Sequence, residues 1–149
     1  MNIWDEYPDK PNFSKPLLQQ TMHKEEVEYL YEISKRLGSG NYANLGVWKG
    51  LSTAALAAGI KDSKNSGKVY AVDLYPYPPE TIINNFIEVG LEKYLEVCKG
   101  STTEWAKKLS NLEFKFIYID ADHSYKQCTE DFLLWNQLLE RNGELAFHD

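Results

Sequence analysis

Five short apolar runs alternate with segments of helical spacing from about residue 24 to the last residue of the sequence. The predicted strands cover 41–47, 68–74, 94–99, 114–121 and 144–148. The predicted helices cover 24–37, 51–60, 81–89, 102–110 and 125–140. Strands that alternate with helices pair in parallel through right-handed crossovers. The alternation therefore predicts an α/β fold, in which helices cover both faces of an open, doubly wound parallel sheet.

The length and composition fit one globular domain. The chain has 149 residues, of which 43% are hydrophobic and 26% charged. A chain of this length buries roughly 68–70% of its unfolded surface, which is enough for a core without disulfides. The net charge of −6 argues against a broad phosphate-binding surface, and so against nucleic acid as a partner. The longest apolar stretch, 54–60, is too short to span a membrane.

Residues 1–22 are expected to form an N-terminal arm on a single domain that spans 23–149. Three prolines interrupt regular structure in the arm, and its aromatic residues favour packing on the domain. The first residues show no signal-peptide pattern. Cys98 and Cys128 form neither a C-x-x-C pair nor a disulfide framework. These features predict a cytoplasmic protein with reduced, buried thiols.

A glycine-containing loop follows the first predicted strand and reads NLGVWKGLST over 44–53. Gly46 and Gly50 allow a tight turn and a close approach of the backbone to a ligand, and the next helix offers its free N–H groups. Trp48 stands where the dinucleotide motif G-x-G-x-x-G has its middle glycine, so its indole would obstruct a diphosphate. Lys49 precedes Gly50, which excludes a Walker motif. The loop favours a nucleoside without a diphosphate, and a plain strand–helix turn is the alternative.

Polar residues also follow the second and third predicted strands. Asp73 lies roughly 20 residues beyond the glycine loop, where an acid typically accepts both ribose hydroxyls. A turn cap is the alternative, although the stiff aromatic loop over 75–79 is not a helix start. Ser101 and Thr102 either cap the next helix or lie against an adenine edge, and the sequence leaves both open.

Asp120, Asp122 and His123 follow the fourth predicted strand, the most apolar of the five. Three groups able to exchange protons or bind a metal are costly to place at the end of a buried strand without a function. Ser124 and Gln127 match a capping box for the next helix, which accounts for Ser124 and for neither aspartate.

The fifth predicted strand ends in His148 and Asp149. If the fourth and fifth strands are neighbours, these side chains would lie beside Asp120 and Asp122. Oxygen and nitrogen ligands of this kind can bind a divalent cation.

Together these motifs resemble the class I S-adenosylmethionine-dependent methyltransferases. The matching segments are NLGVWKGLST, VDLY at 72–75, IDADHSY at 119–125 and FHD at 147–149, of which IDADHSY with its downstream W-x-x-L-L is the most specific. The resemblance covers about residues 20–149. It implies a Rossmann-like, three-layer αβα fold with strand order 3-2-1-4-5. The family fold continues with two further strands, and this sequence stops before them, so either the sequence is a fragment or a second copy of the chain covers the strand-five edge.

The resemblance implies S-adenosylmethionine as the cofactor and O-methylation of a small molecule or sugar. Asp122 would act as the general base, with His123 as the alternative. In metal-dependent relatives Mg²⁺ is held at the positions of Asp120, His148 and Asp149. Asn44 stands where the family usually has an acid that helps to hold the methionine end of the cofactor. The residues implied at the cofactor are Gly46, Val47, Trp48, Gly50, Ser52, Asp73, Leu74, Ser101, Asp120 and Ala121.

Two other functions remain open at this point. The chain could be a non-catalytic or truncated module that binds S-adenosylmethionine or another nucleoside. It could also be a nicotinamide-dependent oxidoreductase domain, against which Trp48 and the missing middle glycine argue.

Overall fold

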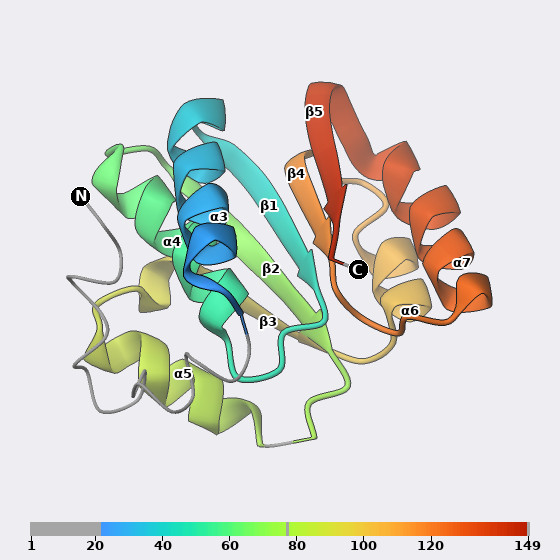
Figure 1. Cartoon of the computed structure of the whole chain (residues 1–149), viewed down its shortest axis with the longest axis horizontal. Helices are drawn as coiled ribbons and strands as arrows, with labels where there is room; N and C mark the ends of the chain where they lie inside the picture. Colours follow the sequence, from blue (N-terminus) through green and yellow to red (C-terminus); the bar gives the residue numbers. More distant parts are fainter. Residues whose placement is uncertain (1–21, 77, 149) are drawn as a thin grey trace.

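The five strands form one fully parallel sheet, as the alternation predicted, and their order is β3-β2-β1-β4-β5 (Figure 1), as the family resemblance implied. The computed structural model describes residues 22–76 and 78–148. The predicted arm, apart from Met22, therefore lies outside the described residues. The strands are β1 (Gly40–Leu45), β2 (Gly67–Asp73), β3 (Leu95–Lys99), β4 (Phe114–Ile119) and β5 (Leu139–Phe147).

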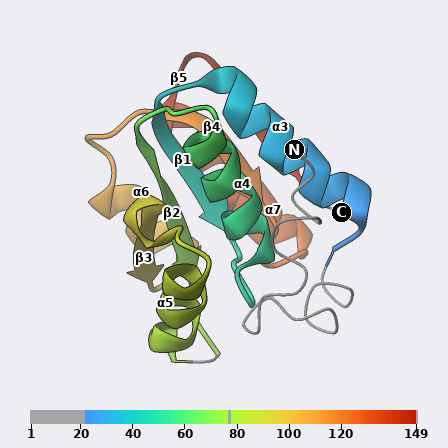
Figure 2. The same ribbon diagram turned by 90° about the vertical axis from the view of Figure 1, so that its left-hand side faces the viewer.

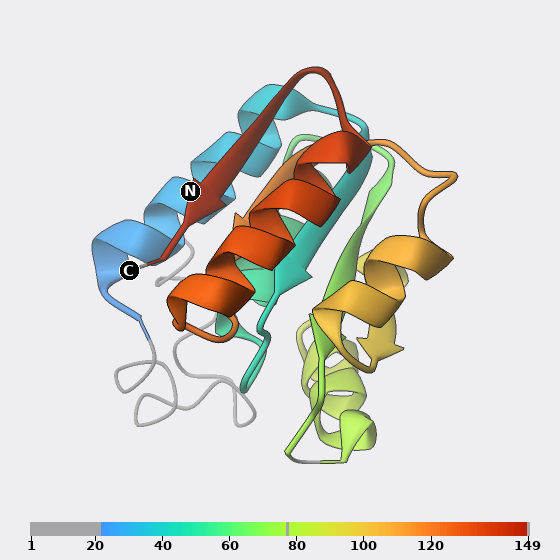
Figure 3. The same cartoon turned by 90° about the vertical axis from the view of Figure 1, so that its right-hand side faces the viewer.

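Helices cover both faces of the sheet and complete the predicted three-layer arrangement. The helices α3, α4 and α5 lie on one face (Figure 2), and α6 and α7 lie on the other (Figure 3). Their bounds are α3 (Lys24–Leu37), α4 (Leu51–Asp62), α5 (Pro79–Glu88), α6 (Thr102–Lys108) and α7 (Tyr125–Trp135), with short 3₁₀ turns η2 (Glu92–Tyr94) and η3 (Asn136–Leu138). Among the described residues, no helix is long and apolar enough to cross a lipid bilayer.

Successive side chains of each strand point to opposite faces, so the sheet separates two apolar cores. On the α6–α7 side, the ring of Phe114 meets Tyr70 and Trp135 edge-on, with centroid distances of 5.6 and 5.8 Å. On the other side, every residue of α4 from Leu51 to Ile60 is buried. Because α4 is enclosed between α3 and the sheet, it has small side chains and is rich in alanine.

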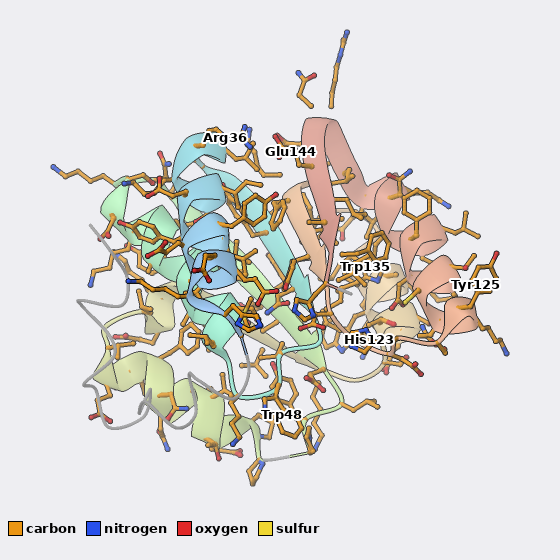
Figure 4. The ribbon with its side chains drawn as sticks, viewed as in Figure 1. Arg36, Trp48, His123, Tyr125, Trp135 and Glu144 are labelled. Atoms are coloured by element: carbon orange, nitrogen blue, oxygen red, sulfur yellow. The ribbon has the colours of Figure 1, made fainter. Side chains whose placement is uncertain are left out.

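Helices α3 and α4 cross at Gly59. A β-carbon at this position would lie 2.0 Å from Ser34 Oγ and 2.3 Å from the carbonyl oxygen of Tyr31. Only a residue without a side chain lets the two helices approach this closely. The C-terminal end of α3 is joined to β5 by an ion pair. The guanidinium of Arg36 lies 2.8 Å from the carboxylate of Glu144 in β5 (Figure 4).

The region from α7 to β5 differs from the sequence prediction. The predicted helix ends at Trp135 instead of residue 140, and β5 begins at Leu139, before the Asn142-Gly143 turn. The strand is irregular there, since its pairing with β4 shifts register between Phe114 and Phe116. The turn is therefore a break inside one strand and not a connection between a helix and a strand.

The apolar residues of α7 are only partly buried. The side chains of Tyr125 and Phe132 are 88% and 41% exposed. The buried residues of α7 are Asp131 and Trp135, which lie one turn apart on the inner face. Phe132 instead lies against Phe147 of β5, with ring centroids 6.2 Å apart.

The two cysteines differ in burial. Cys98 is fully buried, as predicted, and burial raises the pKa of its thiol to about 12. Cys128 is only half-buried, and its thiol donates to the carbonyl oxygen of Asp122 over 3.1 Å. The prediction of a buried thiol therefore holds for Cys98 and fails for Cys128.

We expect Gly59→Ala to lower the free energy of unfolding by about 1–3 kcal/mol, because the new methyl group enters a closely packed crossing. The sign is diagnostic, since alanine in place of glycine inside a helix otherwise favours folding. Urea unfolding followed by circular dichroism measures the change. A midpoint equal to or above that of the unchanged protein would contradict the crossing geometry.

Candidate functional site

The site lies at the carboxyl ends of β1 and β4, where the order of the strands reverses. The amide of Asp120 donates to the carbonyl oxygen of Leu45 over 2.7 Å, which brings the two strand ends together. Gly46, with φ of 88°, lies so close that a β-carbon would be 2.1 Å from the carbonyl oxygen of Asp120. Ligands of open α/β sheets bind outside such a switch point. Trp48 and His123 lie toward this end of the molecule (Figure 4).

The carboxylate of Asp73 holds the glycine loop in place. Its Oδ2 accepts the backbone amides of Val47 and Trp48 over 2.7 and 2.9 Å, and its Oδ1 accepts the amide of Tyr75 over 3.1 Å. These contacts show that the turn-cap role, which the sequence offered as the alternative to ribose binding, is real. A carboxylate has about four acceptor positions, so the described residues leave one of them for a ligand hydroxyl.

A cavity of about 670 Å³ opens at these strand ends. This size lies within the usual range for small-molecule sites, roughly 300–1,000 Å³. The predicted cofactor residues that line it are Gly46, Val47, Trp48, Ser52, Asp73, Leu74, Ser101, Asp120 and Ala121. The predicted base, Asp122, lines it as well.

Gly50 was also expected at the cofactor, but it is not among the cavity-lining residues. It is the N-cap of α4 with φ of 96°, and a β-carbon there would meet Ile82 and Phe86 of α5. Its positive φ shapes the turn into α4, so its place in the loop is explained by backbone geometry.

Asn44 is fully buried at the end of β1 and does not line the cavity. Its side-chain amide donates to the hydroxyls of Ser52 and Thr53 over 2.6 and 2.7 Å. The residue at the position of the family's usual acid therefore fixes the first turn of α4 against the sheet.

Several cavity residues were not predicted. They are Met22, Lys49, Leu51, Val72, Gly100, Thr103 and Gln127, together with Thr102, whose role the sequence left open. Met22 was assigned to the arm, and nothing in the local pattern places it at the site. Gln127 was assigned to a helix cap, although its position one turn into the helix after β4 is a signal for the cavity edge.

The predicted capping box at the start of α7 is only half correct. The hydroxyl of Ser124 accepts the amide of Gln127 over 3.2 Å, as expected. The amide of Ser124, however, donates to Oδ1 of Asp122 over 2.8 Å. The side chain of Gln127 turns away to Thr102 and Asp131. Asp122 thus has a structural role in addition to its place in the cavity.

Imidazole and carboxylate groups gather around Asp120. His148 Nδ1 lies 3.2 Å and His123 Nε2 lies 3.5 Å from its Oδ1, and His148 Nε2 lies 2.9 Å from Oε1 of Glu26 in α3. Burial raises the pKa of Asp120, while the two neighbouring histidines act in the opposite direction. The expected proximity of Asp120 and His148 is confirmed, because β4 and β5 are neighbours.

The metal site stays a prediction. Within residues 22–76 and 78–148, no three His, Cys, Asp or Glu side chains are arranged to hold a metal ion. Both nitrogens of His148 face carboxylates, those of Glu26 and Asp120. Asp149, the third expected ligand, lies outside the described residues.

We expect Asp73→Asn to lower the free energy of unfolding by about 1–3 kcal/mol, because two loop amides lose a charged acceptor. Leu74→Ala is the matched control, since the Leu74 side chain is 70% exposed and its loss should change stability little. Denaturant unfolding of both variants provides the measurement. Equal midpoints for Asp73→Asn and the control would show that Asp73 does not hold the loop.

Comparisons with known proteins agree with this geometry. Residues 43–149 match the family model of a methyltransferase domain. A comparison with curated proteins finds no match.

Three solved structures share the fold at low sequence identity. The O-methyltransferase of Bacillus cereus in complex with SAH is 22% identical, with a TM-score of 0.72 over 87% of this chain and 58% of that chain. The O-methyltransferase TomG of Streptomyces achromogenes in complex with SAM is 14% identical, with a TM-score of 0.73 over 89% and 59%. The SAH-bound methyltransferase PaMTH1 of Podospora anserina is 19% identical, with a TM-score of 0.73 over 89% and 55%.

The chain spans between 55% and 59% of the length of these three structures. The family match covers most of the chain, and the sheet order and the position of the cavity are those that the sequence motifs implied. The chain therefore belongs to the methyltransferase domain family, with the fold of the class I S-adenosylmethionine-dependent methyltransferases.

Proposed function

We propose that this domain binds S-adenosylmethionine and transfers its methyl group to a hydroxyl of a small molecule or sugar. One observation carries the proposal: the glycine loop, Asp73 and the segment Asp120–Asp122 all line a single cavity at the switch point. The solved structures of similar fold include proteins whose titles name bound SAM or SAH.

The residues around the cavity fit this cofactor. The absence of a side chain at Gly46 lets the β1 and β4 loops meet, and Asp73 retains an acceptor position for a ribose hydroxyl. Val47 and Trp48 would lie along the ribose and methionine part. Ser101 would lie by the adenine, and Ala121 near the sulfonium. The side chain of Trp48 lines the cavity and is 48% exposed, and an indole ring can stack on a flat ligand.

Asp122 is the proposed general base. The amide of Ser124 holds its Oδ1, and its Oδ2 accepts no hydrogen bond from any described residue. The carboxylate is therefore oriented by the start of α7 with one oxygen left for the proton of the acceptor hydroxyl. Bound S-adenosylmethionine supplies the electrophilic methyl group. The protein must hold the hydroxyl in line with it, about 3–3.5 Å away, and exclude water.

Two neighbouring groups could take over parts of this role. His123, whose side chain is 54% exposed and 3.5 Å from Asp120, is the alternative base. Mg²⁺ would be held by Asp120, His148 and Asp149, and would lower the pKa of the acceptor hydroxyl. The second candidate function is binding of the cofactor without turnover, in which Asp122 would serve only to hold the amide of Ser124.

Isothermal titration with S-adenosylhomocysteine tests whether the glycine loop is part of a cofactor site or is only a strand–helix turn. We expect micromolar binding by the unchanged protein and by Asp122→Ala, and at least a tenfold loss in Asp73→Ala, about the effect of losing a charged hydrogen bond. The same titration with NAD is the control for a nicotinamide site.

Methyl transfer to a panel of phenols and sugars then tests turnover. Transfer that is lost in Asp122→Ala, with cofactor binding retained, supports the proposed base. Binding without transfer to any acceptor would favour the module. Tighter binding of NAD than of S-adenosylhomocysteine would contradict both.

A surface on α7 and β5 favours association with a second copy. Phe132, Leu133 and Phe147 are 41%, 58% and 47% exposed, and within residues 22–76 and 78–148 β5 is an edge strand of the sheet. Exposed strand edges and apolar patches tend to pair with other chains. We expect light scattering after size exclusion to show a dimer that Phe147→Ser dissociates and Tyr29→Ser on α3 does not. A monomer at all concentrations would contradict this.

A further inference from the structure

A buried carboxylate lies directly behind the cavity wall. Asp131 of α7 is fully buried, and its Oδ1 accepts the hydroxyl of Thr102 over 2.5 Å and Nε2 of Gln127 over 2.9 Å. Its Oδ2 has no hydrogen-bond partner among the described residues. Burial raises the pKa of Asp131, against the effect of the two donors. Burying an acid with one unpaired oxygen lowers the stability of the fold. The presence of Asp131 at this position therefore needs a reason other than stability.

One effect of Asp131 is to fix the orientation of the Gln127 amide. The hydroxyl of Thr102 has a single hydrogen, which it donates to Asp131, so it accepts from Nε2 of Gln127 over 3.2 Å. Both hydrogens of Nε2 are therefore used, one by Asp131 and one by Thr102. A rotated amide would place its oxygen against the Asp131 carboxylate and compete with Asp131 for the single hydrogen of Thr102, which disfavours that orientation.

The other end of the Gln127 amide is a ready acceptor. Gln127 lines the cavity. Its Oε1 accepts no hydrogen bond from any described residue, and it is not one of the buried unpaired atoms. Two side chains thus hold an exposed carbonyl oxygen in one orientation in a cavity-lining residue. A ligand group that donates a hydrogen bond would complete this arrangement.

The position of Gln127 indicates which part of the ligand would donate this hydrogen bond. Its partner Thr102 follows Ser101 at the end of β3, next to the strand that ends in Asp73. If Asp73 binds the ribose, as in the proposed function on which this inference rests, the base extends toward the end of β3. We propose that Oε1 of Gln127 accepts a hydrogen bond from the exocyclic amino group of adenine, and that Asp131 is the positioning residue for this contact.

Replacing adenine by hypoxanthine tests the contact. Hypoxanthine carries a carbonyl oxygen in place of the amino group. This oxygen and Oε1 of Gln127 are both acceptors, so they would repel each other. By calorimetry, we expect the unchanged protein to bind S-adenosylhomocysteine about tenfold more tightly than S-inosylhomocysteine. Gln127→Met removes the acceptor at similar size, and the preference should fall to about twofold or less.

Three further variants separate recognition from general damage. Glu130→Gln changes the neighbouring contact between α7 and α6, the one with Thr103, and should keep the preference. Asp131→Asn keeps an acceptor for Thr102 and Gln127, so the preference should also be kept in this variant. Asp131→Ala frees the Gln127 amide, so the preference should fall. The readout is a ratio of two affinities, which a weakened fold would not change.

The outcomes distinguish this inference from the function on which it rests. Equal binding of the two ligands by the unchanged protein, or an unchanged preference in Gln127→Met, would overturn the role of Gln127 and leave the proposed cofactor in place. An unchanged preference in Asp131→Ala would overturn the positioning role. If the unchanged protein bound neither ligand, both the inference and the proposed function would fall.

Discussion

The contact between Gly46 and Asp120 is the constraint on which the site depends. The carbonyl oxygen of Leu45 accepts the amide of Asp120, and the space between the two strand ends leaves no room for a β-carbon at Gly46. This contact joins the two halves of the sheet at the point where the strand order reverses. It is also what brings the glycine loop and the Asp120–Asp122 segment to the same cavity.

Asp73 adds a second tie between the same elements. By accepting the amides of Val47 and Trp48, it couples the end of β2 to the glycine loop. A residue that would bind a ribose is then also part of the scaffold that shapes the pocket. This double role means that binding and stability data on Asp73 must be interpreted together.

Much of the fold could be predicted from the sequence because it depends on local patterns. The apolar runs at 68–74 and 114–121 are too short for helices, and their alternation with helical segments determines a parallel sheet. The site followed from the same argument, since parallel strands end at one edge. The position of Asp73 and of Asp120 at that edge needed no knowledge of side-chain packing.

What escaped prediction depends on contacts distant in sequence. In α7 the apolar Phe132 is partly exposed, whereas the helix turns Asp131 inward, where the hydroxyl of Thr102 in α6 donates to it. Gln127 was read against its neighbour Ser124, whereas its partners lie 25 residues upstream and 4 residues downstream. A pattern of apolar residues in one helix cannot show that a residue of another helix donates a hydrogen bond to a buried acid.

The central claim is that one adenosyl ligand contacts the ends of β1, β2 and β4 at the same time. Nuclear magnetic resonance of the labelled protein during titration with S-adenosylhomocysteine tests it most directly. The account predicts that the backbone amides of Val47, Leu74 and Ala121 shift together with a single dissociation constant. If only one of these loops responded, or if they responded with different constants, the ligand would not span the switch point and the account would be contradicted.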